Sequence, residues 1–205
     1  MLDFEEYLER LASAAPTPGG GSAACFVGAM SAALVAMVAR ITAGAEKFHA
    51  IREPAGVIAS GADTLRARFL AARPIDEAAY GAVVAAQSLP RQTAAERTAR
   101  TERLQAALRL AAEAPLVAAG LAADAISLCE AAAGLHNDQL SSDIECALSF
   151  ARAALDAGVA NVRINHRYLN DAGIVGAQRE RLSEIVAAAS IAEVRVHMLL
   201  PAPRE

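Results

Sequence analysis

The sequence predicts an all-α fold: a single-domain bundle of seven to nine helices, with a long buried helix after a Gly-rich loop. Of the 205 residues, 55% are hydrophobic but only 4% are aromatic. Alanine, which has the highest helix propensity, makes up about a quarter of the chain. No segment alternates apolar and polar residues as a half-buried strand does. One core suffices for a chain of this length, so residues 1–205 are treated as one domain.

The first helix is expected to begin at Asp3, with Phe4, Leu8 and Leu11 on one face. A loop rich in Pro and Gly follows, over residues 15–21. Its prolines favour extended backbone, and its glycines allow conformations closed to other residues.

Ser22 is expected to cap the next helix, which runs to about Gly44. No charged residue occurs from Ala23 to Ala39, so this helix should be buried on all sides in the bundle. A membrane span is the alternative for the uncharged run over residues 11–39, but that run begins with a loop and is mostly Ala, Gly and Ser.

Prolines, polar breaks and a capping pattern divide the rest of the chain. Pro54 fits the first turn of a helix, Pro115 opens or kinks the next helix, and Ser142 with Glu145 reads as a capping box. Asp76 and Asp143 are both placed to cap helices. The expected helices cover residues 54–73, 76–88, 93–113, 115–133, 142–157 with an extension towards 168, and 176–200.

The net charge and the cysteines indicate which partners and which compartment to expect. A net charge of −4 gives no reason to expect a nucleic acid or an anionic membrane as partner. Cys25, Cys129 and Cys146 are read as buried, reduced thiols. Because residues 1–10 are acidic and lack a signal-peptide pattern, we expect a cytoplasmic protein.

The Gly-rich loop, Gly19-Gly20-Gly21-Ser22, has two interpretations. It lacks the Lys-Ser/Thr ending of a phosphate-binding loop, and no strand precedes it. It is either a plain tight turn or a helix start whose N–H groups hold a ligand.

Lys47 is the only lysine beside eighteen arginines. It is either a chance survivor or a group retained because a lysine amine, unlike a guanidinium, can give up its proton. Asn161 and Asn165 lie one helical turn apart, next to Arg163, either as a solvated helix end or as hydrogen-bonding partners. The four histidines show no metal-ligand spacing, so no metal is expected.

Taken together, these segments resemble the formiminotransferase-cyclodeaminase C-terminal family, which includes stand-alone methenyltetrahydrofolate cyclohydrolases. The matching segments cover nearly the whole chain: residues 16–22, 37–38, 41–44, 47–48, 76–80, 89–90, 114–116, 142–143 and 161–165. Two segments depart from the family pattern, at residues 45–48 and 136–139.

The resemblance implies an all-helical homodimer that acts on a reduced folate. It implies hydrolysis of methenyltetrahydrofolate to formyltetrahydrofolate, or release of ammonia from formiminotetrahydrofolate, with no cofactor beyond the tetrahydrofolate substrate. A non-catalytic folate-binding or structural helical dimer is the rival hypothesis, since the two departures fall in the implied site.

The resemblance also implies roles for particular residues. Asp143 or Asp76 would be the acid/base carboxylate, and Lys47 its partner. The implied substrate-binding residues are Gly19, Gly20, Gly21, Ser22, Asn137, Ser142, Asn161, Arg163 and Asn165.

Overall fold

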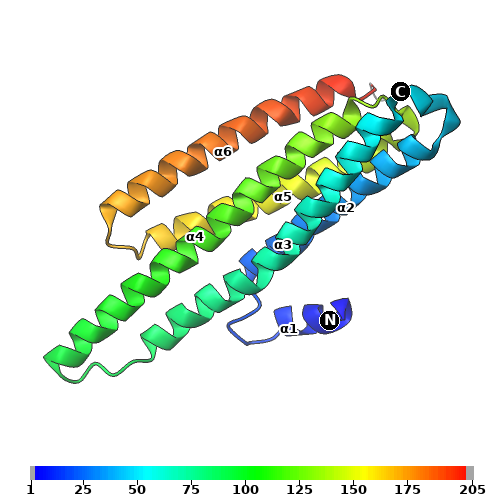
Figure 1. Ribbon diagram of the computed structural model, residues 1–205. Coiled ribbons are helices and arrows are strands. Elements are labelled where there is room, and N and C mark those ends of the chain that lie inside the picture. Colours follow the sequence, from blue (N-terminus) through cyan, green and yellow to red (C-terminus); the bar gives the residue numbers. More distant parts are fainter. Residues whose placement is uncertain (1–2, 202–205) are drawn as a thin grey trace.

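The protein is an elongated bundle of long helices in a computed structural model that describes residues 3–201 (Figure 1). Within that range there are six α-helices, two short 3₁₀ helices and no strand. They are α1 (Phe4–Leu11), α2 (Gly20–Gly44), η1 (Glu46–Ile51), α3 (Arg52–Gln87), α4 (Ala94–Ala133), η2 (Asp138–Leu140), α5 (Ser141–His166) and α6 (Ala172–Leu199). The all-α prediction is confirmed, but seven to nine helices was too many.

The helix number was wrong because two prolines lie inside helices. Pro74 is within α3 and Pro115 within α4, so two pairs of expected helices are continuous. A proline inside a helix removes the bond to the carbonyl four residues earlier. For Pro115 this is the Ala111 carbonyl, which instead accepts a hydrogen bond from Asn165 Nδ2 at 2.8 Å. A side chain from α5 therefore satisfies the carbonyl that the proline leaves free.

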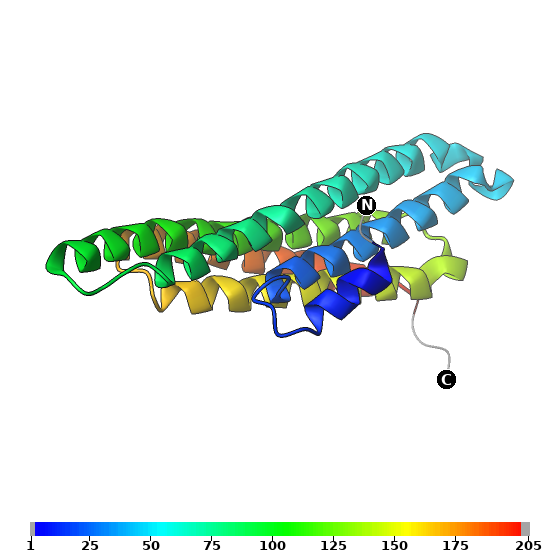
Figure 2. The ribbon, with the colours of Figure 1, turned by 90° about the horizontal axis from the view of Figure 1, so that it is seen from below.

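Helices α2 and α5 run antiparallel and share one layer of the bundle. Ser31 Oγ donates to the Ala147 carbonyl at 2.7 Å, and Gly20 lies against Asn161. Helix α3 pairs with α2, and α4 pairs with α3 and α5, while α6 packs mainly on α4 (Figure 2). The α3–α4 hairpin continues beyond the start of α2, so this start lies inside the length of the bundle (Figure 1).

The core is built from small side chains, which lets the helices approach closely. Most buried core residues of α4 are alanines. A Cβ at Gly28 would overlap the Phe69 ring, and a Cβ at Gly158 would lie 3.0 Å from Ala119 Cβ. The high alanine content thus sets the packing distance as well as the helix propensity.

Three predictions about helix starts were wrong. Ser22 is not a cap, because α2 begins at Gly20 with Gly19 as N-cap. Ser142 and Asp143 form no capping box, since α5 begins at Ser141 without a side-chain cap. Asp76 lies in the middle of α3. These side chains are therefore available for other contacts.

Burial departs from the sequence prediction at two places. Cys25 and Cys129 are buried, and burial raises the pKa of each thiol to about 12, but Cys146 is exposed. Helix α2 is not buried on all sides: Met30, Met37 and Ile41 are exposed. By length and composition α2 and α4 could each span a membrane, yet 61% and 56% of their apolar stretches are buried in the bundle, as in a core helix.

Candidate functional site

A cavity of about 270 Å³ lies where α2 begins. The loop before α2, the middle of α3, one position of α4 and the end of α5 all contribute to it. The lining residues are Pro16, Thr17, Gly19, Gly20, Gly21, Asp76, Glu77, Tyr80, Ala111, Asn161 and Asn165. This cavity is called the Gly-loop pocket below.

Asp76 is the carboxylate closest to the start of α2. A Cβ at Gly21 would collide with it, approaching within 2.6 Å of Asp76 Cγ, so only glycine fits at this position. Burial and the neighbouring charge of Glu77 raise the pKa of Asp76, while a hydrogen bond to the Ser22 backbone opposes that shift. The helix start, one of whose two interpretations was a ligand-binding site, thus holds the protein's own carboxylate.

A buried hydrogen-bond network surrounds Glu77, the residue after Asp76. Ser22 Oγ donates to Glu77 Oε1 at 2.7 Å and lies 3.0 Å from the Tyr7 hydroxyl. Arg73 Nη1 forms a salt bridge with the same Glu77 oxygen at 2.6 Å. Tyr7 belongs to α1, and its ring packs against the ring of Phe26 in α2. The short first helix therefore fixes the base of the pocket.

Asn161 and Asn165 both use their amide nitrogens within the protein. Asn161 Nδ2 donates to the Ala157 carbonyl, and Asn165 Nδ2 donates to the carbonyls of Ala111 and Asn161, each at 2.8 Å. Because a carbonyl can only accept, these contacts fix the amide orientations. Each side-chain Oδ1 is left to accept a hydrogen bond, at two positions that line the pocket. Of the two interpretations, a solvated helix end or hydrogen-bonding partners, the structure has the second, through the Asn161 backbone carbonyl.

The structure gathers half of the predicted site in the Gly-loop pocket and places the rest elsewhere. Ser22 lies directly beneath the lining residues Gly19, Gly20, Gly21, Asp76, Asn161 and Asn165. Lys47 lies beyond the other end of α2, about 36 Å away along that helix. Its Nζ donates to Gln139 Oε1 at 3.3 Å and lies over the Phe48 ring.

Asn137, Ser142 and Asp143 share that distant end of the bundle. Asn137 is buried, and its Nδ2 donates to Thr42 Oγ1 at 3.0 Å while its Oδ1 has no partner. Asp143 is separated from Asn161 by about 27 Å along α5. Within one protomer these residues cannot touch a ligand held by the Gly loop.

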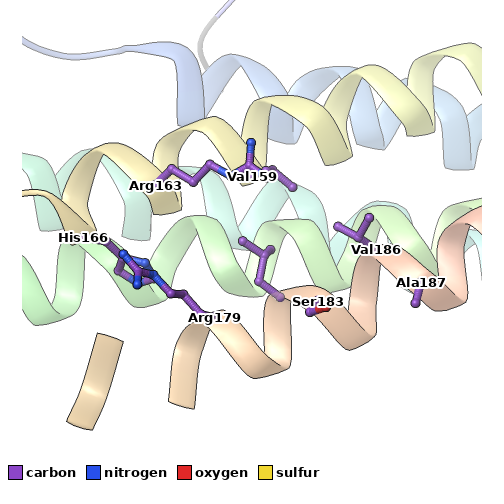
Figure 3. Close-up of a pocket in the computed structure, with 8 residues that line it drawn as sticks. Val159, Arg163, His166, Arg179, Ser183, Val186 and Ala187 are labelled. Carbon is purple, nitrogen blue, oxygen red and sulfur yellow. The ribbon is translucent and has the colours of Figure 1, made fainter. Parts of the chain in front are cut away.

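Arg163 lines a different groove, on the opposite side of α5. It lies there with His166 of the same helix and Arg179 of α6 (Figure 3). His166 Nε2 is 2.8 Å from Gln178 Oε1, which anchors the ring between the two helices. The expected contact of Arg163 with a ligand at the Gly loop is therefore not formed in the protomer.

The sequence interpretation missed Glu77 and Tyr80. Both lie on the same face of α3 as Asp76. This face has helical spacing, because Arg73, Glu77 and Tyr80 follow one another at intervals of four and three residues. The sequence interpretation placed a helix start at Asp76. Residues before and after Asp76 were therefore not considered as one face of a continuous helix.

The Gly-loop pocket is acidic and rich in acceptors. Two carboxylates and two amide oxygens line it, and none of its lining residues is a lysine or arginine. Such a site suits a cationic or N–H-bearing group better than an anion. Within residues 3–201, no three His, Cys, Asp or Glu side chains are arranged to hold a metal ion.

Comparisons with known proteins indicate the family to which the chain is similar. The family profile described as formiminotransferase-cyclodeaminase matches residues 3–184. A methenyltetrahydrofolate cyclohydrolase of Methylorubrum extorquens is 34% identical over 95% of this chain and 93% of its own length. A formimidoyltransferase-cyclodeaminase of Rattus norvegicus is 27% identical over the whole chain, which spans 38% of that longer protein.

A solved structure has the same fold. The formiminotetrahydrofolate cyclodeaminase of Thermotoga maritima superposes with a TM-score of 0.87 at 27% identity, and the match covers 97% of this chain and 96% of that one. The same helical arrangement therefore occurs in a protein named as a cyclodeaminase.

Proposed function

The chain belongs to the formiminotransferase-cyclodeaminase family, and we propose that it hydrolyses methenyltetrahydrofolate to formyltetrahydrofolate. The cyclohydrolase of M. extorquens supports this reaction, because the similarity extends over nearly the full length of both chains.

The observation that carries the proposal is the acidic Gly-loop pocket. The methenyl bridge is an amidinium cation, with its positive charge shared by two nitrogens. Asp76 offers negative charge beside it, while the charge of Glu77 is paired with Arg73. The Oδ1 atoms of Asn161 and Asn165 offer acceptors for pterin N–H groups. A pocket lined by arginine or lysine would repel the same group.

The reaction needs a group that moves protons at the bridge carbon. In the proposed step, Asp76 accepts a proton from water as the water oxygen bonds to that carbon. The neutral tetrahedral intermediate then collapses: its hydroxyl oxygen forms the C=O bond, one C–N bond breaks, and the hydroxyl proton passes to the released nitrogen. The products are the formyl compound and one proton.

Cyclodeamination is the second candidate, favoured by the T. maritima structure. There the folate nitrogen outside the pterin ring adds to the formimino carbon, and ammonia leaves after protonation. The same pocket would serve, with the Asp76 carboxyl donating the proton. Here the raised pKa of Asp76 helps, because it keeps the carboxyl protonated to higher pH.

We also propose a homodimer in the cytoplasm that needs no cofactor beyond the folate. The homodimer is supported by the separation of the predicted site into two groups. Asp143 and Lys47 can keep the acid/base roles implied by the resemblance only if a second copy brings them to the pocket.

The test is an absorbance assay with purified protein. Wild type should speed loss of the methenyl band, and Asp76→Asn should remove the acceleration. Asp124→Asn is a matched control, because Asp124 is an exposed aspartate of α4 that lies outside the pocket, beside Arg68. Ammonia release from the formimino compound, without methenyl hydrolysis, would instead identify a cyclodeaminase. Saturable folate binding without turnover would overturn both reactions.

A further inference from the structure

A second cavity lies between α5 and α6, on the side of α5 that faces away from the Gly-loop pocket. It is the groove lined by Arg163, His166 and Arg179, and its volume is about 520 Å³ (Figure 3). Helix α6 packs mainly on α4, which leaves this space beside α5. A cavity of such a volume can hold a small molecule. It is called the α5–α6 groove below.

The charged groups that line the α5–α6 groove are cationic. Arg163 comes from α5 and Arg179 from α6, so the two guanidinium groups belong to facing walls. Within residues 3–201 neither arginine forms a salt bridge. None of the lining residues is an aspartate or a glutamate. Two guanidinium groups without a counter-charge in one groove favour an anionic ligand.

Glu113 of α4 does not neutralise these arginines, because its two oxygens are already engaged. Its Oε1 pairs with Arg181 at 3.1 Å, and its Oε2 accepts a hydrogen bond from Gln178 Nε2 at 3.0 Å. An ionised carboxylate can only accept, so Gln178 turns its Oε1 towards His166, whose Nε2 donates to it. These contacts fix the buried His166 ring, so this wall of the groove is formed before any ligand binds.

The rest of the α5–α6 groove is apolar. It is lined by Val159 of α5 and by Leu182 and Val186 of α6. On α6 these residues follow Arg179 by three and seven positions, so they continue the same face over the next two turns. Figure 3 shows Arg179 towards one end of the groove and Val186 towards the other. A ligand that matches both parts carries an anionic group beside a small apolar body.

Donors on both walls suit a phosphate better than a carboxylate. A phosphate monoester has three terminal oxygens that point in different directions. The two oxygens of a carboxylate lie in one plane, and a single guanidinium fork satisfies them. In the groove the donors are Arg163, Arg179 and the hydroxyl of Ser183, and they come from two helices.

We propose that the α5–α6 groove binds a phosphate monoester with a small apolar or aromatic body. Arg163 and Arg179 hold the phosphate oxygens, and Ser183 donates a further hydrogen bond. The body packs against Val159 and Val186. This site is separate from the Gly-loop pocket and does not depend on the reaction proposed there, because the pocket is acidic and the groove is basic.

Calorimetric titration with phenyl phosphate tests the site. Wild type should bind this probe, and Arg179→Gln should weaken the binding by about tenfold or more, because a charge-assisted contact is lost. Arg103→Gln is the matched control, since Arg103 is an exposed arginine of α4 outside the groove. The control should bind as wild type does. No binding by wild type, or an equal loss in both variants, would overturn the proposal.

Two further probes separate the phosphate from the apolar body. Benzoate carries the same ring on a carboxylate, and inorganic phosphate lacks the ring, so both should bind more weakly than phenyl phosphate. Ala187 is an exposed lining residue, and Ala187→Trp should fill the apolar end. This variant should weaken phenyl phosphate and leave inorganic phosphate unchanged. Benzoate that binds as tightly as phenyl phosphate, or an Ala187→Trp variant without effect, would overturn the assigned ligand.

Asp76→Asn shows whether the probe occupies the groove or the Gly-loop pocket. Phenyl phosphate should bind this variant as it binds wild type, and a changed affinity would overturn the inference. The methenyl assay keeps the proposed function apart from the groove. An inactive wild type that binds phenyl phosphate would contradict the function and support the groove, and an active wild type that does not bind it would do the reverse.

Discussion

At the scale of single residues, Asp76 combines a catalytic position with an unfavourable environment. It is held at the start of α2 by a glycine that admits no side chain, beside the charge of Glu77. Burial disfavours the charged form of this carboxylate, so its presence there lowers stability at neutral pH. A role in function explains its position better.

The raised pKa of Asp76 predicts how stability depends on pH. Its folded-state pKa lies above the unfolded value of 3.8, so the folded state binds the proton more tightly. The stabilising contribution of this carboxyl is complete below pH 3.8 and is lost as the pH rises through the folded pKa. Asp76→Asn should therefore unfold at higher denaturant concentration than wild type at pH 7, with no difference at pH 3. In the methenyl assay it should lose about 10²- to 10⁴-fold in rate. A variant less stable than wild type at pH 7 would contradict this prediction.

A second residue-scale prediction concerns Asn165 and Pro115. Asn165→Ala leaves the Ala111 carbonyl without its donor and should cost about 1 kcal/mol in the free energy of unfolding. In a Pro115→Ala background the backbone N–H at position 115 can bond that carbonyl, so the same substitution should cost less. Urea unfolding of the four proteins measures the coupling. If the effects of Asn165→Ala and Pro115→Ala simply add, the Ala111 carbonyl does not depend on Asn165 for its hydrogen bond.

At the scale of elements, the pairing of α2 with α3 depends on a missing side chain. Gly28→Ala forces a Cβ into the Phe69 ring and should lower the free energy of unfolding by about 1–3 kcal/mol. Gly81→Ala is the control, because nothing lies within 4 Å of a Cβ at that helical position. It should instead stabilise by about 0.5–1 kcal/mol through helix propensity. Denaturant midpoints of both variants check the sign, and equal shifts would refute the packing argument.

The turn between α4 and η2 offers another element-scale prediction. His136 has φ of 52°, in the left-handed region that favours glycine, at the place where the chain departs from the family pattern. His136→Gly should raise the free energy of unfolding by up to about 1 kcal/mol. His136→Ala keeps the Cβ and should bring no gain. Thermal melts distinguish the two variants.

The elements also show the limits of sequence interpretation. The long helix after the Gly loop and the continuation of α5 past Gly158 were predicted correctly, because both follow from apolar periodicity. The helix boundaries expected near Pro74 and Pro115 were wrong. Whether a helix continues through a proline depends on hydrogen-bond partners elsewhere in the chain. For Pro115 that partner is Asn165, fifty residues away.

At the scale of the whole molecule, the proposed homodimer makes stability depend on protein concentration. The melting temperature should rise with concentration, because association stabilises the folded chain. Melts at two concentrations a hundredfold apart measure the effect, and a constant wild-type melting temperature would contradict the dimer.

What the sequence determined by itself is the helical class and the long helix after the Gly loop. Helix propensity and periodicity are local, so they can be read from neighbouring residues. Only the tertiary structure decided that Asp76 occupies the start of α2, and that Asp143 and Lys47 stand at the far end of the bundle. These outcomes depend on the antiparallel register of α2 with α3 and α5, which close packing of alanine and glycine sets between segments far apart in the chain.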